Sequence, residues 1–189
     1  MNSSLVYLLA AGHGRRAGGP KAWLESEGRP LLARQLEFLL RRFPPASVAV
    51  SVQEAWLERC RALQPAVRWV SVDPEASPLA SLQALMRALP LTSWAFLYHV
   101  DMPVWNDELF TLLGTFPPKD RDRPYEAVVP THGGGGGHPV LLSPFLREPL
   151  AVLPPESGRL DHFLRGRRTF RVEVPYPCVV ENWNSGPAS

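Results

Sequence analysis

The hydrophobic pattern alternates between two periods from residue 5 to residue 113. Short, continuous apolar runs bounded by turn residues are typical of buried strands, and apolar residues repeating every three or four positions are typical of amphipathic helices. We therefore expect strands at residues 5–10, 48–52, 68–72 and 94–100, and helices at 30–43, 54–63, 78–89 and 107–113. This alternation predicts a mostly parallel sheet with helices on both faces, because parallel neighbours need a crossover connection.

The pattern changes after residue 116. Short strands are expected at 126–129, 140–142, 170–174 and 179–180, with a helix at 159–164. We therefore expect one α/β domain over residues 1–189. It should be a Rossmann-like three-layer sandwich with a mostly parallel central sheet and a small β extension. Ligands bind at the carboxyl ends of parallel strands, so the loops after the first and fourth strands should share a cleft.

Composition and charge narrow the class of protein only slightly. The chain has 189 residues, a net charge of +2 and 45% hydrophobic residues, which is ordinary for a soluble globular protein. The basic run at residues 165–171 is short and is interpreted as a solvated face, so no nucleic-acid partner is expected. Cys60 and Cys178 form no CxxC pattern, and no signal peptide or long apolar run is evident. We expect a cytoplasmic protein without a membrane partner.

The loop after the first predicted strand carries the strongest chemical signal. Its glycines at 12, 14, 18 and 19 let the backbone approach a ligand closely, and cations follow at 15, 16 and 21. Backbone N–H groups and cations together favour a polyphosphate. A flexible basic surface loop is the plainer alternative.

A dinucleotide site is a second alternative for the same loop. Residues 12–17 satisfy the GxGxxG/A pattern. That pattern needs a helix starting within it and an acidic residue at the tip of the second strand. Here Gly18-Gly19-Pro20 follows at once, and the second predicted strand ends in SVQ. The dinucleotide interpretation is therefore disfavoured.

The segment LAAGHGRRAGGPK (residues 9–21) resembles the L-A-A-G-x-S-x-R-M-G-x-x-K signature of the molybdenum cofactor nucleotidyltransferases, the MobA/MocA-like NTP transferases. Arg16, Gly18 and Lys21 fall on signature positions, whereas Gly14 replaces the usual serine and Ala17 the usual methionine. The resemblance continues through KAWLESEGRPLL, SPLASLQALMRAL, YHVDMP and GHPVLLS, and more weakly through ESGR and NWNS. It covers nearly the whole chain.

The resemblance implies transfer of a nucleoside monophosphate from an NTP to a phosphorylated acceptor, with release of pyrophosphate. It assigns catalytic roles to Arg16, Lys21 and Asp101. The implied nucleotide-binding residues are Leu9, Ala10, Ala11, Gly12, Gly14, Gly18, Lys21 and Ser81. The implied acceptor-binding residues are Gly137 and His138, on a five-glycine loop that a ligand would order.

Magnesium is the implied cofactor. Asp101 ends a predicted buried strand at the cleft, where a hard oxygen ligand suits Mg²⁺. A turn-forming aspartate before proline is the alternative. Asn182 and Asn184 would add amide oxygens to the metal site, unless NWNS is simply a polar tail. His99 and Asp101 share one face of the strand, but a zinc or iron site is disfavoured because no further histidine cluster has ligand spacing.

Several finer questions stay open at this point. The acceptor is expected to be molybdenum-bound molybdopterin, with CTP favoured by GHPVLL and GTP by SPLASL. A sugar-phosphate nucleotidyltransferase is the nearest alternative. A nucleotide-binding regulator that has lost catalysis is the other, because of the departures at Gly14, Ala17 and Ser185-Gly186. The expected assembly is a monomer or weak homo-oligomer.

Overall fold

The structure is a computed structural model, which describes residues 4–14, 19–102, 104–117, 125–156 and 158–183. The α-helices are α1 (Leu31–Leu40), α2 (Leu57–Leu63), α3 (Pro78–Ala88), α4 (Asp107–Leu113), α5 (Arg147–Ala151) and α6 (Leu160–Arg165). The strands are β1 (Leu5–Leu9), β2 (Glu25–Ser26), β3 (Arg29–Pro30), β4 (Val48–Val52), β5 (Arg68–Ser71), β6 (Ala95–His99), β7 (Ala127–His132), β8 (Gly135–Gly136), β9 (Val140–Leu142) and β10 (Thr169–Glu173). Short 3₁₀ helices are η2 (Lys21–Trp23), η3 (Pro45–Ser47), η4 (Glu54–Trp56), η5 (Pro144–Leu146) and η6 (Pro177–Val179).

One eight-stranded sheet organises the fold. Its strand order is β10-β7-β9-β6-β1-β4-β5, with β8 paired to β7. The strands β6, β1, β4 and β5 run parallel, whereas β9 is antiparallel to both β6 and β7. The expected mostly parallel α/β sheet is therefore confirmed, with the antiparallel strands grouped on the side of β9.

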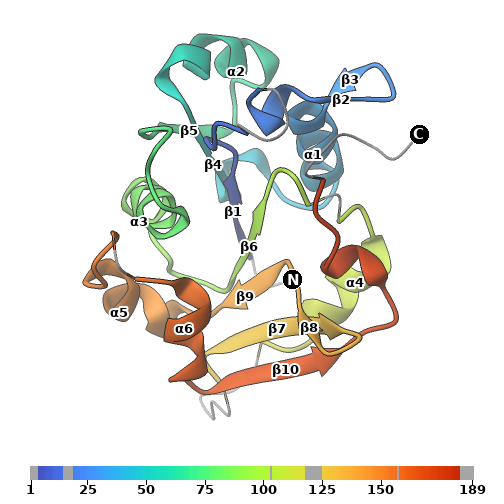
Figure 1. Cartoon of the computed structure of the whole chain (residues 1–189), viewed down its shortest axis with the longest axis vertical. Helices are drawn as coiled ribbons and strands as arrows, with labels where there is room; N and C mark the ends of the chain where they lie inside the picture. The colour runs from blue at the N-terminus through green and yellow to red at the C-terminus, as the bar shows by residue number, and fades with distance from the viewer. Residues whose placement is uncertain (1–3, 15–18, 103, 118–124, 157, 184–189) are drawn as a thin grey trace.

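Helices cover both faces of this sheet (Figure 1). Side chains alternate along β1, so that Val6 and Leu8 pack with residues of α1, α2 and α4. Tyr7 and Leu9 point to the opposite face and pack with residues of α3, α5 and α6. All five residues of β1 are buried, as expected for the central strand of a parallel sheet.

Three segments differ from the sequence expectation. Residues 179–180 do not form a strand, because Pro177 begins the 3₁₀ helix η6 there. The hairpin β2–β3 was not predicted; its turn residues Glu27 and Gly28 both have positive φ, and Glu-Gly is not a common hairpin signal. Part of the five-glycine run pairs with the sheet, since β8 pairs antiparallel with β7.

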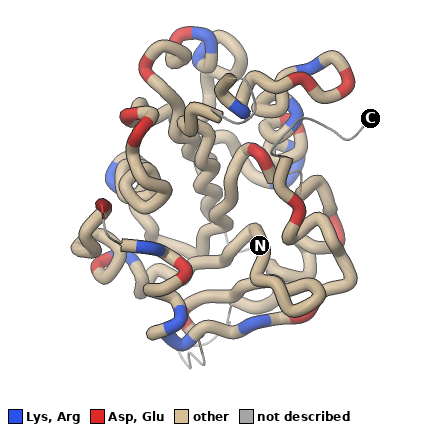
Figure 2. The backbone as a smooth tube through the Cα atoms, viewed as in Figure 1, with Lys and Arg blue, Asp and Glu red and all other residues tan. Residues whose placement is uncertain are grey.

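Basic and acidic residues alternate through much of the chain that the structure describes (Figure 2). Within the basic run, Arg165 Nη2 donates to Asp161 Oδ2 at 3.3 Å. Across the described ranges, no helix is both long and apolar enough to cross a membrane.

Candidate active site

The site lies where β1 and β6 end side by side. β1 pairs in parallel with β6 along its whole length, with Leu9 opposite His99. The loops that follow these strands therefore begin next to each other, as parallel strands require. This register brings segments that are far apart in the sequence to one sheet edge.

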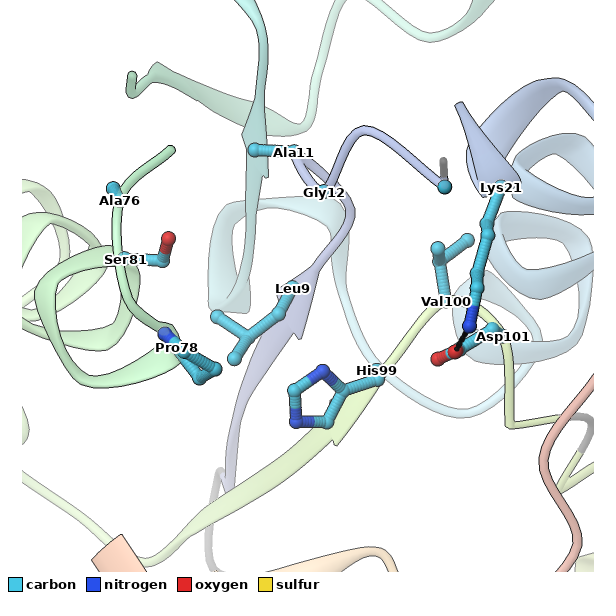
Figure 3. Close-up of a pocket in the computed structure, with 11 residues that line it drawn as sticks. Leu9, Ala11, Gly12, Lys21, Ala76, Pro78, Ser81, His99, Val100 and Asp101 are labelled. Atoms are coloured by element: carbon cyan, nitrogen blue, oxygen red, sulfur yellow. Dashed lines mark hydrogen bonds and ion pairs between the residues drawn. The ribbon is translucent and has the colours of Figure 1, made fainter. Parts of the chain in front are cut away.

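A cavity of about 270 Å³ opens at this edge. Figure 3 shows the α3 side of the cavity facing Lys21 and Asp101 across the end of β1. Its lining comes from the end of β1, the glycine loop, the start of α3 and the end of β6: Leu9, Ala11, Gly12, Gly14, Lys21, Ala76, Pro78, Ser81, His99, Val100 and Asp101.

Lys21 and Asp101 meet in this cavity. Lys21 Nζ lies 2.5 Å from Asp101 Oδ2, and the two side chains are only 20% and 10% exposed. Lys21 begins η2, and Asp101 lies two residues beyond the end of β6. The fold thus joins the signature lysine to the strand-end aspartate in a sheltered place, where electrostatic interactions are stronger than in bulk water.

The glycine loop is fixed by the neighbouring strand β4. Ala10 N donates to Ser51 O at 3.0 Å. Gln53, just beyond β4, donates from Nε2 to Ala11 O at 2.9 Å. Gly14 has a φ of +59°, and a Cβ there would lie 1.9 Å from Gly19 O. The departure from serine at this position therefore has a backbone reason, because only glycine fits this turn.

The opposite wall is the first turn of α3. Ser77 caps the helix by accepting from Ala80 N at 3.0 Å, and Pro78 occupies the first turn, a favoured place for proline. The helix amino end, with its partial positive charge, therefore borders the cavity. Ser81 lies one turn further on and contributes to the lining.

One histidine lines the cavity, and a second packs against it. His99 contributes to the cavity, and its ring meets the His138 ring edge to face at a centroid distance of 5.4 Å. Burial, helped by the adjacent His99, lowers the pKa of His138 to about 4. Burial also lowers the pKa of His99, although the Asp101 charge opposes this shift. Both imidazoles are therefore uncharged at neutral pH.

The turn that carries His138 is held tightly. Gly137 N donates to Pro130 O at 2.8 Å, and His138 N donates to Val179 O at 2.8 Å. A Cβ on Gly137 would lie 2.4 Å from Val179 O. Backbone bonds to β7 and η6 hold this turn, and its ordering by a bound acceptor stays a prediction.

The structure gathers most of those expected site residues that it describes. Those that line the cavity are Leu9, Ala11, Gly12, Gly14, Lys21, Ser81 and Asp101. Ala10 does not, because it points to the other face of the sheet and is buried in the core. Gly137 and His138 lie behind His99 and do not line the cavity. Arg16, Gly18 and Asn184 lie outside the described residues.

Two further observations concern the expected metal site. The side chain of Asn182 is exposed, but the chain does return to the cleft there, since Trp183 N donates to Asp101 O at 2.8 Å. Within the described ranges, no three His, Cys, Asp or Glu side chains cluster as a ready metal site. Asp101 is thus a single buried carboxylate that faces a cavity.

His99 is the site residue that the sequence analysis did not assign. It was considered only as a metal ligand beside Asp101. Its alternation along β6 was the available signal, because it places His99 on the same face as Leu97 and on the side of the strand that packs with α3.

Comparison with known families decides how this geometry is interpreted. The family model of the MobA-like NTP transferase domain matches residues 6–172. The chain belongs to the MobA-like NTP transferase family. The resemblance drawn from the sequence motifs is therefore confirmed, and the dinucleotide interpretation of the glycine loop is wrong. This family membership and the fold make the chain a nucleotidyltransferase.

Solved structures support the same assignment of the fold, whereas no curated protein matches significantly. Rv0371c from Mycobacterium tuberculosis shares 25% identity with a TM-score of 0.71, over 96% of this chain and 95% of that chain. Its complex with manganese aligns with 24% identity and a TM-score of 0.69, over 97% and 95% of the two chains. Molybdopterin-guanine dinucleotide biosynthesis protein A from Archaeoglobus fulgidus shares 16% identity with a TM-score of 0.69, over 95% and 92%. The bifunctional IspDF from Campylobacter jejuni shares 13% identity with a TM-score of 0.77, over 97% and 52%.

Proposed function

We propose that this MobA-like NTP transferase moves the nucleoside monophosphate of CTP or GTP onto the phosphate of molybdenum-bound molybdopterin. An anionic oxygen of the acceptor phosphate attacks the α-phosphorus, a new P–O bond forms, and the bond to the β-phosphate breaks. Pyrophosphate leaves with the electron pair. The observation that carries the proposal is the Lys21–Asp101 pair in the cavity beneath the glycine loop.

The chain's own part in this reaction is to position charges. Lys21 holds triphosphate oxygens, and the backbone of the loop at residues 11–14 surrounds the phosphates. Arg16 and Gly18, outside the described residues, complete this loop in the proposal. Alignment of the two reacting groups and stabilisation of charge in a sheltered site account for most of the catalysis in such transfers.

Asp101 is proposed as the cation ligand. One or two carboxylates, with substrate phosphates, are what Mg²⁺ needs from a protein. The single buried carboxylate of Asp101 fits this requirement, and Asn182 and Asn184 are proposed as further oxygen donors. The manganese complex of Rv0371c supports a divalent cation in this family. A bound Mg²⁺ would neutralise phosphate charge and make the α-phosphorus more electrophilic.

The remaining walls divide between the two substrates. Ser81, with Leu9 and Ala11, is proposed to contact the base and ribose. Gly137 and His138 are proposed to border the acceptor, with His138 acting through the His99 ring. The two uncharged imidazoles provide hydrogen-bonding groups without adding positive charge.

A pyrophosphate-release assay tests the proposal. The protein is incubated with Mg²⁺, each of the four NTPs, and either molybdopterin carrying molybdate, molybdopterin alone, or a panel of sugar phosphates. We expect release with CTP or GTP only when the molybdenum-bound acceptor is present. Release with a sugar phosphate would overturn the acceptor assignment. Nucleotide binding without release under any condition would indicate a regulator.

A further inference from the structure

Gln35 is a polar residue in the middle of the hydrophobic face of α1. Its neighbours Leu31, Leu32, Leu36 and Leu39 are core residues, and Gln35 itself is 0% exposed. A primary amide buried this completely needs partners for both its N–H groups and its oxygen. Its partners therefore show what it does.

The partners of Gln35 lie on both sides of Asp101. Gln35 Nε2 donates to Val100 O at 3.1 Å and to Met102 O at 2.7 Å. These carbonyls belong to the residues immediately before and after the aspartate. The amide thus holds the backbone across Asp101 at the point where the β6 ladder ends.

The amide oxygen of Gln35 accepts two further hydrogen bonds from the same part of the chain. Gln35 Oε1 accepts from Trp105 Nε1 at 2.9 Å and, at a longer 3.4 Å, from the hydroxyl of Tyr98. One side chain on α1 therefore contacts the segment from the end of β6 to residue 105 at four points.

An outer layer completes this support. The Trp105 ring packs edge to face against Trp183 at 5.7 Å, and the Arg34 guanidinium lies 4.2 Å from the Trp105 ring centroid. Trp183 N in turn donates to the carbonyl of Asp101 itself. The backbone at Asp101 is therefore held from α1 and from the carboxyl-terminal segment at once.

We infer that Gln35 is a positioning residue for the Asp101 carboxylate, which it orients toward the cavity without touching either substrate. The inference rests on the proposed function, because it takes Asp101 as the cation ligand. Residues that orient a metal ligand have measurable effects on metal affinity even though they do not contact the metal. An apolar residue at position 35 would leave two carbonyls and an indole N–H without their partner.

The test compares two buried glutamines with the same chemistry. Gln83 on α3 is 7% exposed and also donates to two backbone carbonyls, Leu150 O at 2.8 Å and Leu153 O at 2.7 Å. Gln35→Met and Gln83→Met each remove one amide and keep a similar side-chain length. Binding of Mn²⁺ in the presence of a non-hydrolysable NTP analogue is followed by electron paramagnetic resonance, and thermal unfolding is measured in parallel.

We expect Gln35→Met to raise the Kd for Mn²⁺ about tenfold, in the range seen for residues that orient metal ligands. Gln83→Met should change that Kd less than about twofold. It should lower the melting temperature by about as much as Gln35→Met does. Wild-type Mn²⁺ affinity in folded Gln35→Met would overturn the inference. An equal loss of affinity in both variants would also overturn it, because the effect would then follow stability alone.

Two further variants separate the possible failures. If Gln35→Met does not fold, Trp105→Phe replaces it, because this change removes the indole N–H bond to Oε1 and keeps an aromatic ring beside Trp183 and Arg34. A Kd two to three times the wild-type value is expected, and an unchanged Kd would overturn the inference. Asp101→Asn tests the assumption beneath it. If Asp101→Asn loses Mn²⁺ binding and Gln35→Met keeps the wild-type Kd, only the positioning role is rejected. If Asp101→Asn binds Mn²⁺ like the wild type, the proposed cation ligand is rejected and the inference with it.

Discussion

The two sides of the cavity are built on different principles. On one side, the ends of parallel strands β1 and β6 bring Lys21 and Asp101 into direct ionic contact. On the other side, antiparallel pairing of β7, β8 and β9 places the turn of His138, where the two histidines are uncharged at neutral pH. Charge is thus concentrated where a triphosphate is proposed to bind. The histidine side, towards β9, offers shape and neutral hydrogen-bonding groups. Substitutions on the two sides should therefore change different measurements.

Removing the carboxylate from the charged side should have the largest effect. We expect Asp101→Ala to lower kcat/KM by about 10³-fold or more, which corresponds to about 4 kcal/mol of transition-state stabilisation. Pyrophosphate release at saturating Mg²⁺ measures the loss. Asp101→Asn is the matched control for shape, since it keeps the side-chain size and removes the charge.

The same experiment can refute the proposed role of Asp101. Both variants should remain folded, since Trp183 N and the Gln35 amide hold backbone carbonyls rather than the carboxylate. Circular dichroism checks this point. Near-normal turnover in either folded variant would mean that Asp101 is a structural partner of Lys21 and no more.

Lys21 should show the second largest effect on the charged side. We expect Lys21→Ala to lower kcat/KM for the NTP by about 10²-fold to 10³-fold, similar to the loss of one preorganised charge or donor in other enzymes. The acceptor KM should change far less. Initial rates with one substrate varied at a time separate the two. Lys21→Arg keeps the charge and should retain more activity than Lys21→Ala, and unchanged NTP kinetics in Lys21→Ala would remove Lys21 from the phosphate site.

The neutral side should be recognised by its pH dependence. The pKa of His138 falls from 6.5 to about 4 on folding, so the unfolded chain binds a proton in this window and the folded chain does not. The contribution of the neutral His138 to the free energy of unfolding is therefore fully present above about pH 6.5. It decreases as the pH falls towards 4, by an amount on the order of 2–3 kcal/mol. His138→Gln should flatten this part of the curve of unfolding free energy against pH.

Urea unfolding at intervals between pH 7 and pH 4 measures that curve. The His99 pKa is also lowered, so His99→Gln should reduce the slope in the same direction. Exposed carboxylates such as Glu173, whose pKa is lowered by its bond from Thr131, contribute at lower pH in all variants. A wild-type slope in His138→Gln would show that its imidazole is not sheltered in the folded protein.

The sequence predicted the charged side better than the neutral side, for physical reasons. Lys21 ends the loop after one predicted buried strand and Asp101 follows another, and the rule that parallel strands end at one edge was enough to join them. The neutral side depends on long-range pairing. The glycines did not predict that β8 pairs with β7 or that Gly137 contacts Val179, and no local pattern reveals that contact. His99 was considered only as a metal ligand, because its partner His138 lies in the turn between β8 and β9, far away in the sequence. For Gln35 the sequence predicted only a place in a helix, because its proposed role depends on carbonyls 65 and more positions away.

The smallest effect expected on the charged side comes from the glycine loop, and it bears on the departure at position 14. Gly14 and Gly12 lie two residues apart in the same loop, yet their surroundings differ. A Cβ at Gly14 would lie 1.9 Å from Gly19 O at a φ of +59°, whereas a Cβ at Gly12 meets nothing within 4 Å.

Gly14→Ala must therefore move the backbone that is proposed to surround the phosphates, and we expect about a tenfold rise in the NTP KM, equivalent to about 1.4 kcal/mol. Gly12→Ala should change it about twofold at most, although both glycines line the cavity. Equal effects would mean that side-chain bulk in the cavity matters more than loop shape. An unchanged NTP KM in Gly14→Ala would mean that the turn at position 14 does not shape the nucleotide site. The departure from serine there would then need an explanation other than the backbone conformation.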